Sequence, residues 1–167
     1  WQATTGINVI GDPSNAPNQV AEITASGAQA YKALPTAISN VNTGTLHFRL
    51  RRYGHIDGFT GLSDLAAPND WVSYETQFGA QSAHAADEFV VRDSGQFDVL
   101  GNYFADQTWY CLWLVANNPN DSYQVYAQGG AFATPTPLDA AGQTTFGFRN
   151  GGGDALLTFL ARMDTSK

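Results

Sequence analysis

Cysteine and positive charge are both scarce in this sequence of 167 residues. Its single cysteine, Cys111, excludes an internal disulfide, and because Cys111 lies inside an apolar run we expect a buried, unreactive thiol. Lysine and arginine number 8 against 15 aspartates and glutamates, which gives a net charge of −7. This balance argues against a nucleic-acid partner, since neutralising phosphates requires a basic surface.

Long apolar runs and familiar catalytic signatures are missing as well. No stretch is long and apolar enough for a transmembrane helix, so we expect no membrane partner. The sequence contains no H-E-x-x-H metal motif, no phosphate loop and no Ser/His/Asp nucleophile elbow. It opens at Trp1 without an export signal. We expect a secreted, extracellular module cut from a longer precursor, with the signal upstream.

Turn-forming and aromatic residues are what the sequence has in quantity. It holds 17 glycines, 13% of its residues are aromatic, and only 14% are charged. Such a composition, with β-branched runs between Gly/Asn/Asp clusters, favours an all-β chain. The length suits one domain with its own core, so we predict a single antiparallel β-sandwich over residues 1–167.

Alternating side chains mark the expected strands. In Thr45–Tyr53 the residues Leu46, Phe48 and Leu50 face one way, and the intervening polar residues face the other. Thr108–Ala116 is apolar on both faces, which predicts a central strand containing at least one core tryptophan out of Trp109 and Trp113. The remaining expected strands are Val20–Thr24, Ala28–Leu34, Asp70–Phe78, Glu88–Asp93, Phe97–Leu100, Ser122–Gln128, Thr144–Arg149 and Leu156–Met163. A loop is expected over Gly11–Asn18, a turn over Asn117–Asp121, and one short helix near Ser63–Ala67.

Three stretches resemble concanavalin A-like (laminin-G-like) jelly rolls. They are "WYCLWLVANNPNDSYQVYAQGG", "NVIGDPSNAPNQVAEIT" and "TGTLHFRLRR". The first has the aromatic-led strand, Asn/Asp turn and second strand of that family, and the second is similar to the first strands of such domains in bacterial polysaccharide-degrading enzymes. The resemblance implies a jelly roll whose function is sugar binding, glycoside hydrolysis or polysaccharide lysis.

The aspartates and glutamates of this sequence are not spaced as a glycosidase of this family requires, and the sequence patterns of its lyases are absent. The related glucanases carry an E-x-D-x-x-E type motif, which this sequence lacks, and a retaining glycosidase needs two carboxylates close together. The lyase patterns R-x-E-x-R and Q-I-H are also missing, although His47, Arg49, Gln77 and Tyr126 are residue types that such lyases use. We therefore expect a non-catalytic carbohydrate-binding module, a monomer tethered to a degrading enzyme. A small polysaccharide lyase and an adhesive or structural cell-surface domain stay open as alternatives.

The outward-facing positions of the expected strands supply a candidate binding site. Flat aromatic rings suit the C–H faces of sugars, and planar polar groups suit hydroxyls, carboxylates and sulfates. Three of the few bases cluster at Arg49, Arg51 and Arg52, which suggests an anion site. The predicted ligand-binding residues are His47, Arg49, Arg51, Trp71, Glu75, Gln77, Arg92, Gln124 and Tyr126. The expected ligand is a polysaccharide, and anionic polysaccharides of the algal type, which carry sulfate or carboxylate groups, are among the candidates.

Two aspartates near the expected chain ends are candidates for a structural calcium ion. Asp12 follows the first strand and Asp164 ends the last one. The resemblance implies that calcium is held where these ends meet, and calcium takes six to eight oxygen ligands, which Asp-rich loops supply.

Overall fold

Antiparallel β-strands form nearly all the regular structure. The computed structural model describes residues 1–12, 15–54, 56–85 and 88–166. The strands are β1 (Gln2–Ala3), β2 (Ile7–Asp12), β3 (Asn15–Ile23), β4 (Gln29–Ile38), β5 (Thr43–Leu50), β6 (Ile56–Ser63), β7 (Phe78–Ala80), β8 (Glu88–Asp93), β9 (Gln96–Tyr103), β10 (Tyr110–Asn117), β11 (Ser122–Gly129), β12 (Phe132–Pro137), β13 (Phe146–Gly147) and β14 (Leu156–Ser166). Two three-residue 3₁₀ helices, η1 (Trp71–Ser73) and η2 (Asn118–Asn120), complete them. Within the described residues no helix is long and apolar enough to cross a membrane.

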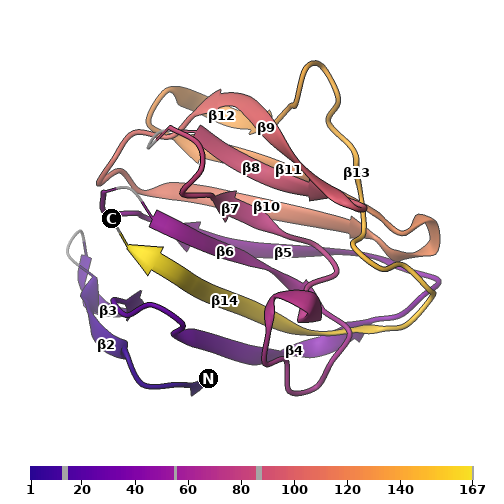
Figure 1. Cartoon of the computed structure of the whole chain (residues 1–167), viewed down its shortest axis with the longest axis horizontal. Helices are drawn as coiled ribbons and strands as arrows, with labels where there is room; N and C mark the ends of the chain where they lie inside the picture. The colour runs from indigo at the N-terminus through magenta and orange to yellow at the C-terminus, as the bar shows by residue number, and fades with distance from the viewer. Residues whose placement is uncertain (13–14, 55, 86–87, 167) are drawn as a thin grey trace.

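The strands form two large sheets and one separate hairpin. The larger sheet has seven strands in the order β1-β4-β14-β6-β7-β8-β9. The smaller has five, in the order β12-β11-β10-β5 with β13 paired to β11. Within the described residues, β2 and β3 pair only with each other. Figure 1 shows the seven-stranded sheet nearer the viewer, with β5, β10 and β11 behind it.

The core lies between the two large sheets. One cluster of buried side chains joins Leu62, Phe89 and Val91 of the larger sheet to Leu112 and Val125 of the smaller one. Burial of this apolar surface holds the sheets face to face. The prediction of an all-β, antiparallel sandwich is confirmed.

The alternation in the smaller sheet is also confirmed. Exposed and half-buried residues alternate along β5, and buried and half-buried residues alternate along β10 and β11. β10 pairs with β5 on one side and β11 on the other, so it is a central strand as predicted. The turn between β10 and β11 contains Pro119 and ends at Asp121, whose φ of 45° is left-handed, a conformation that Asp tolerates better than most residues.

Three local predictions are wrong. Asp70–Phe78 is not a strand: Asp70 caps η1, the chain is irregular after it, and the strand begins only at Phe78. The described residues of Gly11–Asn18 belong mostly to β2 and β3 rather than to a loop, while residues 13 and 14 lie outside the described part. The expected helix at Ser63–Ala67 is the end of β6 followed by bends.

Candidate functional site

The outward side of the smaller sheet gathers aromatic, basic and amide side chains. Because inward residues of β5, β10 and β11 fill the core, the intervening ones must point away from it. We call this surface the β5–β10–β11 face. It consists of the strand residues His47, Arg49, Cys111, Trp113, Val115, Gln124, Tyr126 and Gln128, together with Arg51 and Trp109, which adjoin the ends of β5 and β10 and contact one another.

A row of rings crosses the strands at the middle of this face. Strand register places His47 opposite Trp113, and Trp113 opposite Tyr126. The His47 and Trp113 rings lie 5.0 Å apart between centroids. The Tyr126 hydroxyl donates a hydrogen bond of 3.2 Å to Oε1 of Gln124. Since neighbouring strands are about 4.8 Å apart, the row offers a continuous platform of three side chains about 10 Å long.

Two arginines adjoin the row on one side. The Arg49 guanidinium lies 4.7 Å from the centroid of the Trp109 ring, and that of Arg51 lies 4.7 Å from Tyr53 and 6.0 Å from Trp109. Asp12, at the end of β2, forms an ion pair of 3.2 Å with Arg49. The hairpin β2–β3 therefore reaches this face at β5.

The structure brings together five of the nine predicted binding residues: His47, Arg49, Arg51, Gln124 and Tyr126. Arg52, which the sequence groups with its two neighbours, is turned away from them. It is buried, and it donates hydrogen bonds of 2.7 Å to the carbonyl oxygens of Gly54 and Phe104. Arg51 and Arg52 follow the end of β5, and the contacts of Arg52 in the interior keep it out of the patch that Arg49 and Arg51 form beside Trp109.

Trp71 and Arg92 belong to the opposite surface of the sandwich. The Trp71 ring packs edge-on against Phe59 at 5.1 Å, and its indole Nε1 donates a hydrogen bond of 3.0 Å to Asp164. The Arg92 guanidinium lies 4.9 Å from the centroid of Phe97. Both side chains cover the seven-stranded sheet, so the expectation that they share a face with Arg49 is wrong.

Glu75 and Gln77 are buried, because the segment that holds them is not the amphipathic strand that was expected. Gln77 is fully buried, and the Tyr123 hydroxyl donates a hydrogen bond of 2.9 Å to its carbonyl oxygen. Glu75 accepts hydrogen bonds from the backbone N–H groups of Asn150 and Gly151 and from the Asn150 side chain. The expectation that Glu75 and Gln77 face outward is therefore wrong.

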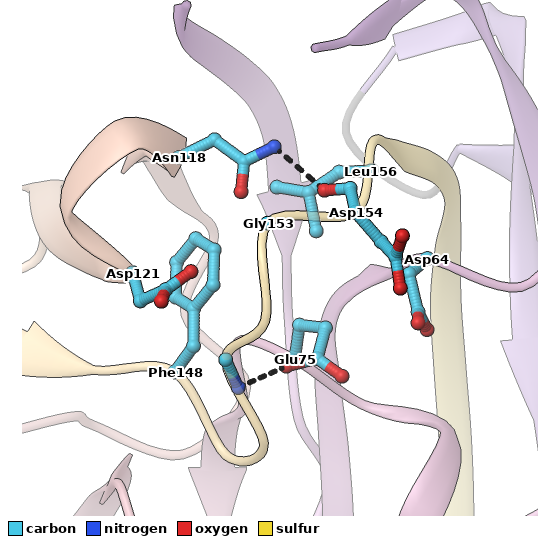
Figure 2. A pocket seen from close by; sticks show the side chains of 9 residues that line it. Asp64, Glu75, Asn118, Asp121, Phe148, Gly153, Asp154 and Leu156 are labelled. Atoms are coloured by element: carbon cyan, nitrogen blue, oxygen red, sulfur yellow. Dashed lines mark hydrogen bonds between the residues drawn. The ribbon is translucent and has the colours of Figure 1, made fainter. Parts of the chain in front are cut away.

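Glu75 lines a small acidic cavity at one end of the sandwich. Figure 2 shows its carboxylate near the loop that carries Gly153, with Asp64, Asp121 and Asp154 around the same hollow. The cavity has a volume of about 10 Å³, room for a single water molecule. The cavity is too small for a sugar. The Glu75 carboxylate instead links the segment before β7 to the loop after β13 through its hydrogen bonds with Asn150 and Gly151.

Glu75 is expected to make stability depend on pH. Burial raises the pKa of its carboxyl. The charge of Asp64 raises this pKa further, and the hydrogen bonds from Asn150 lower it in part. A carboxyl whose pKa is higher in the folded state than in the unfolded state adds to the free energy of unfolding at low pH. This added stability is lost as pH rises through the folded-state pKa. Urea unfolding at a series of pH values should show the wild type losing stability relative to Glu75→Gln as pH rises above 4.5. Parallel pH curves for the two proteins would contradict this.

The two aspartates predicted to bind calcium each contact an arginine. Asp12 pairs with Arg49 at 3.2 Å, and Asp164 lies 3.5 Å from Arg162 and accepts the bond from the Trp71 indole. These contacts do not favour a calcium ion on the same carboxylates. Among the described residues, no three His, Cys, Asp or Glu form a group suited to a metal ion. The calcium ion stays a prediction: if it is bound, a chelator should lower the melting temperature.

Sequence reasoning missed the centre of the β5–β10–β11 face. Trp109 and Trp113 are both half-buried on its outward side, so the prediction of a core tryptophan is wrong, and Cys111 lies between them rather than in the core. The inward set is Tyr110, Leu112, Leu114 and Ala116. Buried and half-buried residues alternate strictly from Tyr110 onward, and this period of two could have identified the outward tryptophans. Because tryptophan is itself apolar, the strand looked apolar on both sides.

Comparisons of the chain with models of protein families, with curated proteins and with solved structures found no match.

Proposed function

We propose that this chain is a non-catalytic polysaccharide-binding module of the concanavalin A-like jelly-roll type, and that its ligand lies on the β5–β10–β11 face. The observation that carries the proposal is the cross-strand row of His47, Trp113 and Tyr126. Pyranose rings present apolar C–H faces to flat aromatic surfaces, and a platform about 10 Å long accommodates about two sugar units.

Polar groups beside the row supply the specificity that stacking alone lacks. Gln124 and Tyr126 are already joined by a hydrogen bond, which fixes the amide and hydroxyl for contacts with sugar hydroxyls. Gln128 and Arg49 lie opposite Cys111 on its two sides, so polar side chains line the row on both neighbouring strands. A module of this kind, secreted and tethered to a degrading enzyme, raises the local concentration of substrate without chemistry.

Affinity electrophoresis against a panel of neutral, carboxylated and sulfated polysaccharides tests this function. We expect at least one polymer to retard the protein while leaving bovine serum albumin unaffected. Failure of every polymer to retard it would contradict the proposal and favour an adhesive or structural cell-surface domain.

A polysaccharide lyase is the second candidate, because His47, Arg49 and Tyr126 share the face. Such an enzyme needs a proton acceptor and an acid-neutralising group around one sugar carbon. Here Trp113 separates His47 from Tyr126 in the register, and Gln77 is buried elsewhere. Ultraviolet absorbance of unsaturated uronate products, followed during incubation with each acidic polymer, separates the two: its appearance would identify a lyase.

A further inference from the structure

The strands of the two sheets differ in their charged residues: those of the smaller sheet carry one base and no acid, whereas those of the larger sheet carry five acids and three bases, Lys32, Arg92 and Arg162. The five strands of the smaller sheet contain no aspartate or glutamate, and β5 carries Arg49. The seven-stranded sheet carries acids on four strands, at Asp57, Glu88, Asp93, Asp98 and Asp164. In a chain of net charge −7, the β5–β10–β11 face thus has no acid on its own strands, and Asp12, which reaches it from β2, is paired with Arg49. This distribution favours an anionic ligand there.

Arg51 is the cation on this face that lacks an acidic partner. Its guanidinium is placed by aromatic rings, 4.7 Å from the centroid of Tyr53 and 6.0 Å from that of Trp109. Across the part of the chain that the structure describes, it forms no ion pair, and its Nε is buried without a hydrogen-bond partner. Rings hold the plane of a guanidinium while leaving its terminal N–H groups free to bind an oxyanion.

Arg49 differs from Arg51 although the two share the face. The Asp12 carboxylate, whose side chain is 1% exposed, pairs with Arg49 at 3.2 Å. Arg49 therefore already has a counter-charge from within the chain. The Asp12 contact also illustrates how a carboxylate docks on an arginine of this surface.

We propose that Arg51 is the anion-binding residue of the module and that the ligand is an acidic glycan, whose carboxylate or sulfate groups contact the Arg51 guanidinium beside the row of rings. This inference rests on the proposed function and narrows its ligand to acidic polymers. Arg49 acts as a positioning residue: it lies on the Trp109 ring, which Arg51 also adjoins, and its ion pair with Asp12 attaches the β2–β3 hairpin to the face.

The test compares Arg51→Gln with Lys32→Gln, which removes the same charge from the exposed side chain of Lys32 on β4 of the other sheet. Calorimetry would use polygalacturonate and a sulfated galactan, each beside its carboxyl-reduced or desulfated counterpart. We expect Arg51→Gln to weaken binding of an acidic polymer about tenfold to a hundredfold, and Lys32→Gln to leave it within about twofold. The polymer affected identifies carboxylate or sulfate as the group that is bound.

Equal losses in the two variants, or equal binding of acidic and neutralised polymers by the wild type, would overturn the inference. In the second case the polysaccharide-binding function would still stand. A titration with sodium galacturonate or sodium sulfate, followed by the side-chain Nε–H nuclear magnetic resonance signal of Arg51, does not depend on any polymer. A saturable shift with either anion is expected, and the absence of a shift with both would overturn the anion site.

Discussion

Replacing Phe104 by alanine is expected to lower the free energy of unfolding by about 3–5 kcal/mol, the usual effect of removing a fully buried phenylalanine. Phe104 is 1% exposed. On one side it stacks on Phe89 with centroids 4.4 Å apart, and on the other it meets Tyr110 at 4.7 Å and Phe132 at 5.5 Å. It thus joins a strand of the larger sheet to two strands of the smaller one. A loss of this size is a large fraction of the stability of a typical domain.

The neighbouring residue provides the matched control for Phe104. Tyr103 is 61% exposed, so Tyr103→Ala removes a ring of similar size without opening the core. We expect it to change the free energy of unfolding by less than about 0.5 kcal/mol. Urea denaturation of the two variants and the wild type measures both values. If Phe104→Ala were no less stable than Tyr103→Ala, the packing of the two sheets described above would be incorrect.

Strand periodicity predicted the sandwich and half of the candidate site. Each of β5 and β11 has one face in the core and one in solvent, so a period of two identifies the outward residues His47, Arg49 and Tyr126 directly. The same reasoning failed for Trp71 and Glu75, because the apparent alternation around them comes from a capped 3₁₀ turn and a buried irregular segment. There the side-chain directions depend on the Asp70 cap and on contacts with residues far along the chain, such as Asn150.

The pairing of strands decides which outward residues meet, and this information is non-local. Four strands, β6 to β9, lie between β5 and β10 along the chain, yet the register of β5 and β10 places His47 beside Trp113 and Arg49 beside Cys111. Trp113 entered the candidate site only through this pairing. The division of Arg49 and Arg51 into a paired and an unpaired cation likewise depends on Asp12, which reaches β5 from a separate hairpin.

Replacing Trp113 by alanine is expected to weaken polysaccharide binding at least about 30-fold, which corresponds to about 2 kcal/mol. Trp113 lies at the middle of the cross-strand row, with His47 on one side and Tyr126 on the other, so its loss interrupts the platform at its centre. Central aromatic residues in interfaces characteristically carry binding energies of this size. The side chain is only half-buried and lies outside the core, so unfolding curves should show a much smaller change than for a core aromatic residue.

Trp1 supplies a control of the same residue type. It is 62% exposed and contacts Phe159, away from the row, so Trp1→Ala removes an accessible indole without touching the proposed platform. Calorimetric titration with a polymer that retards the wild type should give a wild-type dissociation constant for Trp1→Ala and a greatly increased one for Trp113→Ala. Were both variants to bind like the wild type while remaining folded, the ligand could not lie across His47, Trp113 and Tyr126. His47 and Tyr126 do not adjoin each other without Trp113, so they could not form the platform by themselves. The ligand would then have to bind elsewhere, and the aromatic side chains Trp71 and Phe97 on the opposite sheet would be the next candidates.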